Sequence, residues 1–117
     1  MGKRRAEATQ TEMLQGTLDM LILQTLALGA AHGHTIAHVI ERRSEDVLLV
    51  EHGSLYPALQ RLLKAGFVTA EWDISSTNRR IRVYRLTGRG AKNLEEKVSS
   101  FERMIDGITR VLAPGEL

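Results

Sequence analysis

A heptad-spaced apolar stripe near the C-terminus constrains the fold more than any other feature of the sequence. Its members lie alternately three and four residues apart: Ala91, Leu94, Val98, Phe101, Ile105, Ile108 and Leu112. This spacing predicts a helix over residues 87–113, which Thr87 caps and Pro114 ends. A helix of about 25 residues is about 37 Å long, and the rest of so short a chain cannot cover it.

The width of this stripe indicates what the helix does. A strict heptad stripe is narrower than the apolar face with which a helix packs on its own domain. We therefore expect these seven residues, called the apolar seam below, to pair with a second copy of the chain in a homodimer. The alternative that stays open is a core helix within one domain.

Three shorter helices are predicted upstream of the seam. Apolar residues at helical offsets predict a first helix over residues 14–28 and a second over residues 36–43. A third helix follows over residues 54–65, where Ser54 is a suitable N-cap and Gly66 is a typical C-terminal stop.

The predicted strands are shorter than the predicted helices and fewer in number. Residues 47–50 form a short apolar run that predicts a small strand, and residues 67–73 and 81–86 alternate as the two strands of a hairpin. The fold class is therefore mainly α with a small β-hairpin. It divides into a flexible basic arm (1–12), a winged helix-turn-helix domain (13–86), a long C-terminal dimerisation helix (87–113) and a tail (114–117).

Composition excludes several classes of protein. The sequence has no cysteine, so disulfides, thiolate metal sites and cysteine nucleophiles are excluded, and a reducing, cytoplasmic location is expected. No apolar run approaches membrane-spanning length. We also find no phosphate-binding glycine loop, nucleophile elbow or metal-ligand motif, and we expect neither an enzyme nor a cofactor.

The distribution of charge points to a polyanion. The net charge is only +2, yet residues 74–94 contain no acidic residue. The same stretch holds six basic residues: Arg79, Arg80, Arg82, Arg85, Arg89 and Lys92. A second basic group, Lys3, Arg4 and Arg5, lies in the N-terminal arm. Such local asymmetry favours double-stranded DNA as a partner, although an ordinary solvated surface remains the alternative.

The third predicted helix has two chemically distinct sides. Leu55, Leu59 and Leu62 are expected to face the core, and the polar residues lie opposite. Arginine and glutamine are the side chains that read guanine and adenine edges, lysine suits a phosphate, and the helix N-terminus favours phosphate as well. The expected DNA contacts on this helix are Ser54, Tyr56, Gln60, Arg61 and Lys64.

The loop of the predicted hairpin supplies a second set of contacts. We expect Arg79, Arg80 and Arg82 to meet phosphates or a narrow minor groove beside the helix. A rival interpretation is a winged helix that binds a protein partner. The basic charge disfavours it, because a protein-binding face would carry more exposed aromatic residues.

Histidines and the one tryptophan have no clear role in the sequence. His34 and His38 lie four residues apart, with His32 and His52 nearby, so a zinc or nickel site is conceivable. No carboxylate completes the set, and we expect no metal. Trp72 is expected to pack in the core; lining a ligand cavity at a dimer interface is the alternative.

Several sequence segments resemble PadR-type transcriptional regulators. They are Gly16-Thr17-Leu18-Asp19-Met20-Leu21-Ile22-Leu23 with His32-Gly33, then Gly53-Ser54-Leu55-Tyr56-Pro57-Ala58-Leu59-Gln60-Arg61-Leu62, Gly66-Phe67-Val68 and Tyr84-Arg85-Leu86-Thr87 with Gly90. Together they span about residues 13–112. The resemblance implies a dimeric DNA-binding regulator, most often a repressor and sometimes released from DNA by a small-molecule effector. It also supports Tyr56 as a DNA contact.

Overall fold

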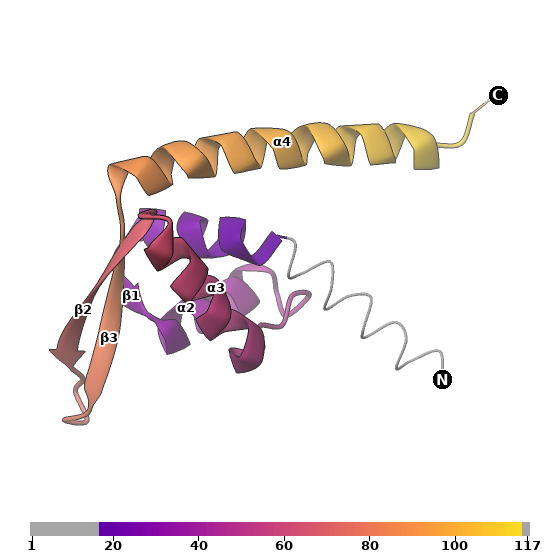
Figure 1. Cartoon of the computed structure of the whole chain (residues 1–117). Helices are drawn as coiled ribbons and strands as arrows, with labels where there is room; N and C mark the ends of the chain where they lie inside the picture. The colour runs from indigo at the N-terminus through magenta and orange to yellow at the C-terminus, as the bar shows by residue number, and fades with distance from the viewer. Residues whose placement is uncertain (1–16, 116–117) are drawn as a thin grey trace.

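The computed structural model describes residues 17–115, in which a small antiparallel sheet lies at one side of a group of helices (Figure 1). The predicted basic arm, with Lys3, Arg4 and Arg5, lies outside the described residues. A helix over residues 17–28 comes first. The elements that follow are β1 (Ala31–His32), α2 (Gly33–Arg43), α3 (His52–Lys64), β2 (Val68–Ile74), β3 (Arg80–Leu86) and α4 (Gly88–Leu112). This order confirms the expected mainly α fold with a hairpin and a long C-terminal helix.

One hydrophobic core joins the 17–28 helix, α2, α3 and the base of the sheet. Its fully buried side chains are Leu18, Ile22, Leu23, Ile36, Leu55, Leu59, Leu62 and Val68. Burying each such aliphatic side chain stabilises the fold by about 1.5–3 kcal/mol. The inward-facing leucines predicted for the third helix are confirmed, and this packing fixes which face of α3 points outward.

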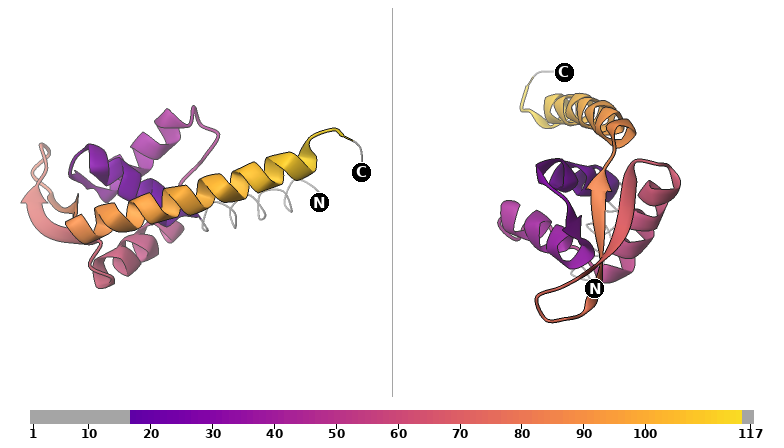
Figure 2. Two further views of the ribbon diagram at one scale, coloured as in Figure 1. Left: turned by 90° about the horizontal axis from the view of Figure 1, so that it is seen from above. Right: turned by 90° about the vertical axis from the view of Figure 1, so that its left-hand side faces the viewer.

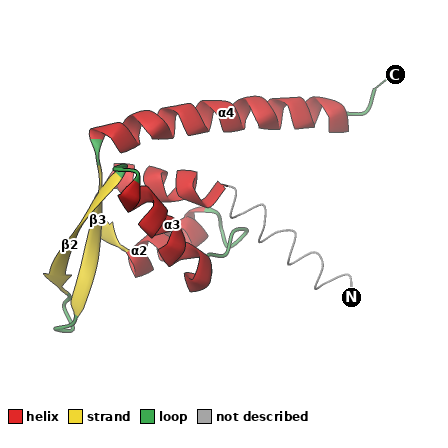
Figure 3. Cartoon of the chain, in the orientation of Figure 1, coloured by secondary structure: helices red, strands yellow, loops and turns green. Residues whose placement is uncertain are grey.

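The β2–β3 hairpin, called the wing below, extends from this core to one end of the molecule (Figure 3). Its register runs from Val68 opposite Leu86 to Ile74 opposite Arg80. At the tip, the Ser75 N–H donates to the Arg79 carbonyl at 2.8 Å, and the Arg79 N–H donates to the Ser75 hydroxyl at 3.1 Å. Asn78 completes this turn with a φ of 61°.

A third, very short strand was not predicted. The sequence indicated only a break near His32, whereas Ala31 and His32 pair with Tyr84 and Val83 to form β1 at the edge of the sheet. The helix α2 also begins directly after it, at Gly33, three residues earlier than expected. A strand of two residues is too short to show an alternating pattern, so the sequence could not reveal it.

The strand predicted at residues 47–50 is wrong. Residues 45 and 46 have positive φ values of 52° and 63°, which close a turn after α2. The Val50 N–H then donates to the Glu41 carboxylate at 2.8 Å, and the Leu48 N–H donates to the Ser44 hydroxyl at 3.1 Å. Side chains therefore take the backbone donors that a neighbouring strand would have used.

The predicted start of the third helix is also wrong. The helix begins at His52 with Glu51 as its N-cap, and Ser54 lies within the first turn, where its N–H donates to the Glu51 carbonyl at 3.0 Å. Pro57 consequently lies inside the helix. The tight packing of Leu55 and Leu59 keeps this segment helical despite the proline.

The start of α4 is fixed to the turn between α3 and β2 by Thr87 and Gly90. The Thr87 hydroxyl accepts from the Gly90 N–H at 3.0 Å, which confirms the predicted cap, and donates to the Gly66 carbonyl at 2.7 Å. A Cβ on Gly90 would lie 2.0 Å from the Phe67 carbonyl oxygen, so only glycine fits there. From this anchor α4 runs over the 17–28 helix and continues past the body of the protein (Figure 2).

Candidate nucleic-acid interface

The outward side of α3 brings together three of the predicted DNA contacts. Tyr56, Gln60 and Lys64 are all exposed, and their spacing of four residues places them along one stripe of the helix. We call these three residues the recognition stripe. Ser54 is half-buried in the first turn and lies on a different side of α3.

The ring of Tyr56 is held in place by neighbours from two elements. It lies against Gly33 at the start of α2, where an added Cβ would be 3.0 Å from the ring atom Cε1. The His52 ring meets it edge-on at 5.9 Å between ring centres. The absence of a side chain on Gly33 therefore lets the phenol approach the α2 N-terminus closely, while Tyr56 remains 45% exposed.

Arg61 has a partner that the sequence did not indicate. Its Nη2 donates to Oδ1 of Asp19 at 2.9 Å, which ties α3 to the 17–28 helix. The Arg61 side chain is still 56% exposed, and that of Asp19 is 25% exposed. The two residues are 42 positions apart, so no local pattern links them. Asp19 was recognisable only as a carboxylate on an otherwise apolar helix.

The wing displays the three predicted arginines. Arg79 and Arg80 are exposed and Arg82 is half-buried. Among the ion pairs of residues 17–115, none involves these arginines. Their positive charge is therefore not neutralised by a paired carboxylate, and it remains available to an external anion.

Trp72 is not a core residue, and that prediction is wrong. Its side chain is 59% exposed on the wing. The guanidinium carbons of Arg80 and Arg82 lie 4.5 Å and 5.5 Å from the centre of its ring. The alternating pattern correctly placed Trp72 on the same strand face as Val68, but this face leaves the core before it reaches Trp72.

Tyr84 lies in the middle strand of the sheet, opposite Ala31 of β1 and Ala70 of β2. It is buried, and burial raises the pKa of its hydroxyl, while the positive charge of Arg82 acts in the opposite direction and Tyr56 adds a small further increase. Both Arg82 and Tyr56 are therefore electrostatic neighbours of one buried hydroxyl. β1 pairs with Tyr84 and Val83, and Gly33, directly after β1, contacts the ring of Tyr56, so β1 connects the recognition stripe to the wing.

The histidines form a row beside Tyr56. The rings of His32 and His34 stack at 6.2 Å, and His34 meets His52 edge-on at the same distance. His32 Nε2 is 3.0 Å from the Thr35 hydroxyl. No group of three or more possible metal ligands occurs within residues 17–115.

The apolar seam on α4 divides into two halves. Its first residues pack on the same chain: Leu94 is only 8% exposed, Val98 contacts the core cluster and Ala91 is half-buried. Farther along, Ile105 and Ile108 are exposed and Leu112 is 77% exposed. The distal half of α4 therefore presents large apolar side chains that the described part of the chain leaves uncovered.

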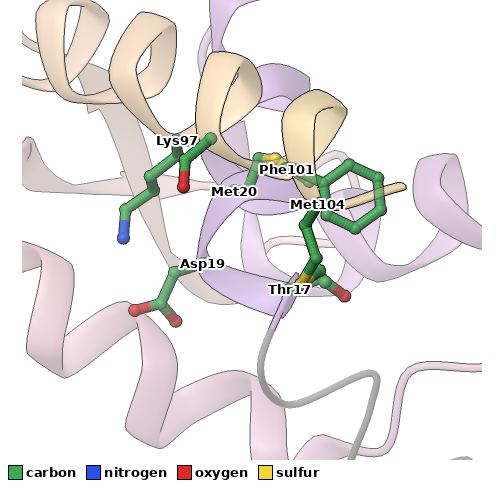
Figure 4. A pocket seen from close by; sticks show the side chains of 7 residues that line it. Thr17, Asp19, Met20, Lys97, Phe101 and Met104 are labelled. Carbon is green, nitrogen blue, oxygen red and sulfur yellow. The ribbon is translucent and has the colours of Figure 1, made fainter. Parts of the chain in front are cut away.

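A cavity of about 270 Å³ lies between the 17–28 helix and α4 (Figure 4). Phe101, Met104 and Met20 form its apolar side, and Lys97 of α4 extends toward the side where Asp19 lies. Thr17 and Ser100 complete the lining. This cavity thus adjoins both the apolar seam and the carboxylate that holds Arg61.

No helix in residues 17–115 is long and apolar enough to cross a membrane.

Comparison with known proteins assigns the chain to a family. The family model described as the transcriptional regulator PadR-like family matches residues 22–96. No curated protein matches the sequence. The fold is similar to that of a PadR family regulator from Eggerthella lenta, with a TM-score of 0.81 and 26% identity over 97% of this chain and 96% of that chain.

Two further structures share the fold. A transcriptional regulator from Clostridium thermocellum has a TM-score of 0.80 and 25% identity, covering 87% of this chain and 99% of its own. Bacillus subtilis PadR in complex with operator DNA has a TM-score of 0.62 and 22% identity, covering 86% of this chain and 50% of its own. With the family model matching more than half of its residues, the chain belongs to the PadR-like family of transcriptional regulators.

Proposed function

We propose that this regulator binds an operator in double-stranded DNA as a homodimer and represses transcription there. The observation that carries the proposal is the uncompensated positive charge of the wing beside the recognition stripe of α3. A helix of this size fits the major groove, and arginines on an adjacent hairpin then reach the backbone or minor groove. The match in fold to Bacillus subtilis PadR in complex with operator DNA supports this placement of α3 and the wing on DNA.

Each residue of this surface has a distinct proposed role. Gln60 and Arg61 would read base edges, because their side chains form bidentate hydrogen bonds with adenine and guanine. Lys64, Arg79 and Arg80 would bind phosphates, which fix the position of the protein but carry no sequence information. Tyr56 and Ser54 lie toward the N-terminal end of α3, where the helix dipole also favours a phosphate.

The distal half of the apolar seam supports dimerisation. Exposed apolar patches of this kind mark interfaces more often than solvated surface, and a second copy of α4 has the matching spacing. A two-fold dimer presents two copies of α3, so its operator would be an inverted repeat with half-sites one or more helical turns apart. The cavity lined by Phe101 and Asp19 is the candidate site for a small-molecule effector.

The test is fluorescence anisotropy of the full chain with a labelled duplex from its own upstream region and with a scrambled duplex. Measurements would run from about 50 to 300 mM salt, because the affinity of a protein that contacts several phosphates falls steeply as salt is raised over this range. The expected result is tight, salt-sensitive binding that prefers the native duplex. An absence of binding to either duplex at low salt would contradict the proposal and favour a protein partner.

A further inference from the structure

The wing carries an aromatic and cationic cluster that the three arginines alone do not explain. Trp72 lies directly across the hairpin from Arg82, and Arg80 lies across from Ile74. Both guanidinium groups approach the face of the same indole, at 4.5 Å for Arg80 and 5.5 Å for Arg82. Residues that pair across an antiparallel hairpin share one face, so all four side chains lie together.

The outer end of this face, at Trp72 and Ile74, lies beyond the core to which Val68 and Tyr84 belong. Trp72 is 59% exposed and Ile74 is also exposed, so neither side chain contributes the buried area for which large apolar residues are usually retained. The acidic residues of β2, Glu71 and Asp73, pair with Val83 and Ile81 on the opposite face of the hairpin. The cluster face is therefore apolar and cationic, with no carboxylate from its own strands.

The cluster is continuous with α3. Arg82 and Tyr84 are alternate residues of β3 and share this face. Tyr84 pairs with Ala31 of β1, and Gly33, directly after β1, contacts the ring of Tyr56. A strip consequently runs from Tyr56 on α3, past Tyr84, to Trp72 and Arg80 near the wing tip. A rod-like polyanion that contacts α3 would follow it.

Stacking on an indole changes what an arginine can do. The cation is attracted to the ring face, and the stack limits the rotamers of a side chain that otherwise loses about 2 kcal/mol of rotamer entropy when it is fixed. The Nε of Arg82 is already buried with no hydrogen-bond partner in the described residues. The terminal nitrogens of both guanidinium groups would thus be oriented before a ligand arrives.

We propose that Trp72 is a positioning residue of the DNA-binding surface, which holds Arg80 and Arg82 side by side so that their outer nitrogens meet neighbouring phosphates of a duplex. The inference rests on the proposed binding of DNA and adds to it a residue that acts through two arginines. It predicts that the contribution of Arg80 to affinity depends on the indole.

A double-mutant cycle tests this dependence in the full chain. Trp72→Ala is expected to weaken binding to native and scrambled duplexes alike by about two- to fivefold, the size of an exposed cation–π contact. Trp72→Phe should keep part of the affinity. Arg80→Ala should cost less affinity in the Trp72→Ala background than in the wild type, because the two residues act as a unit.

A matched control and a second readout complete the test. Thr69→Ala, on the opposite face of β2, should leave affinity unchanged. Trp72 is the single tryptophan, so its emission should change when unlabelled duplex is added. Wild-type affinity of Trp72→Ala, an additive cycle and unchanged emission, in a protein that does bind DNA, would overturn this inference alone. Failure of the wild type to bind any duplex would overturn the proposed function and this inference together.

Discussion

Asp19 and Arg61 form an ion pair of 2.9 Å that links the 17–28 helix to α3 across 42 positions of sequence. Arg61 uses one terminal nitrogen in this bond, and a guanidinium group has five N–H donors. The side chain therefore retains donors for a base edge while it is tethered. Asp19 also lines the cavity beneath α4, so it contacts both the candidate effector site and the candidate DNA-reading arginine.

Separate substitutions of Arg61 and Asp19 distinguish the proposed contact of Arg61 with a base from its ion pair with Asp19. We expect Arg61→Ala to reduce the preference for the native over the scrambled duplex, because a bidentate contact contributes about 1–3 kcal/mol of discrimination. Asp19→Asn should leave this preference intact and lower the free energy of unfolding by less than about 1 kcal/mol, since the pair is partly exposed. Anisotropy and urea unfolding measure the two effects. An equal loss of preference in both variants would mean that Arg61 only positions α3.

Gly90 should be the least replaceable glycine of the described chain. The Cβ of Gly90→Ala would lie 2.0 Å from a backbone carbonyl oxygen, which cannot rotate away as a side chain can. We expect the free energy of unfolding to fall by about 3 kcal/mol or more, the upper end of the overpacking range. Gly88→Ala is the matched control, because nothing lies within 4 Å of its Cβ. Urea denaturation compares the two, and similar midpoints would contradict the prediction.

Gly33 offers a way to move Tyr56 without altering it. A Cβ there would be 3.0 Å from the phenol ring, so the ring of Tyr56 must shift outward in Gly33→Ala. We expect weaker DNA binding, by about three- to tenfold if one hydrogen bond of about 1 kcal/mol is lost, with little change in the unfolding midpoint. Gly53→Ala, which meets open space on α3, is the control. If Gly33→Ala bound DNA with unchanged affinity, the position of the Tyr56 ring would not matter for DNA binding.

The features that could be predicted from the sequence are those with repeated patterns. The periodic leucines of α3 and the alternation of β2 and β3 place these elements correctly, since burial on one face imposes a period. Val47 and Leu49 have strand-like composition, yet the Glu41 carboxylate and the Ser44 hydroxyl hold that segment as a loop. Composition contains no information about which backbone donors a distant side chain will satisfy.

In the candidate site, too, only the features that follow a periodic pattern could be predicted from the sequence. Exposure of Gln60 and Lys64 follows from the helix period, but the pairing of Arg61 with Asp19 requires the tertiary structure. Trp72 was wrongly predicted to be a core residue because alternation indicates only which face of a strand a side chain is on. The length of the helices that pack on the sheet decides how much of that face is covered. The wing extends beyond the helices, and Trp72 lies on the uncovered part.

The salt dependence of binding tests the wing. Arg79→Ala together with Arg80→Ala should weaken binding to native and scrambled duplexes about equally, because phosphate contacts carry no sequence information. The slope of log affinity against log salt should become shallower by about 0.9 for each phosphate that the protein no longer neutralises. Anisotropy titrations at several salt concentrations measure this slope, and an unchanged slope would remove the wing from the interface.

The distal half of the apolar seam tests the dimer without disturbing the protomer. Ile105 and Ile108 are exposed in the single chain, so replacing both with lysine should leave the core intact, unlike a change at Val98, which contacts it. In a dimer, the two substitutions would bury four unpaired charges, each at a cost of several kcal/mol. We therefore expect Ile105→Lys with Ile108→Lys to sediment as a monomer and to lose most of its affinity for an inverted repeat. Glu102→Lys, on the same helix but outside the seam, should remain dimeric. A dimer that survives the double substitution would show that the subunits meet elsewhere, and the first half of α4 would then act only as part of its own domain.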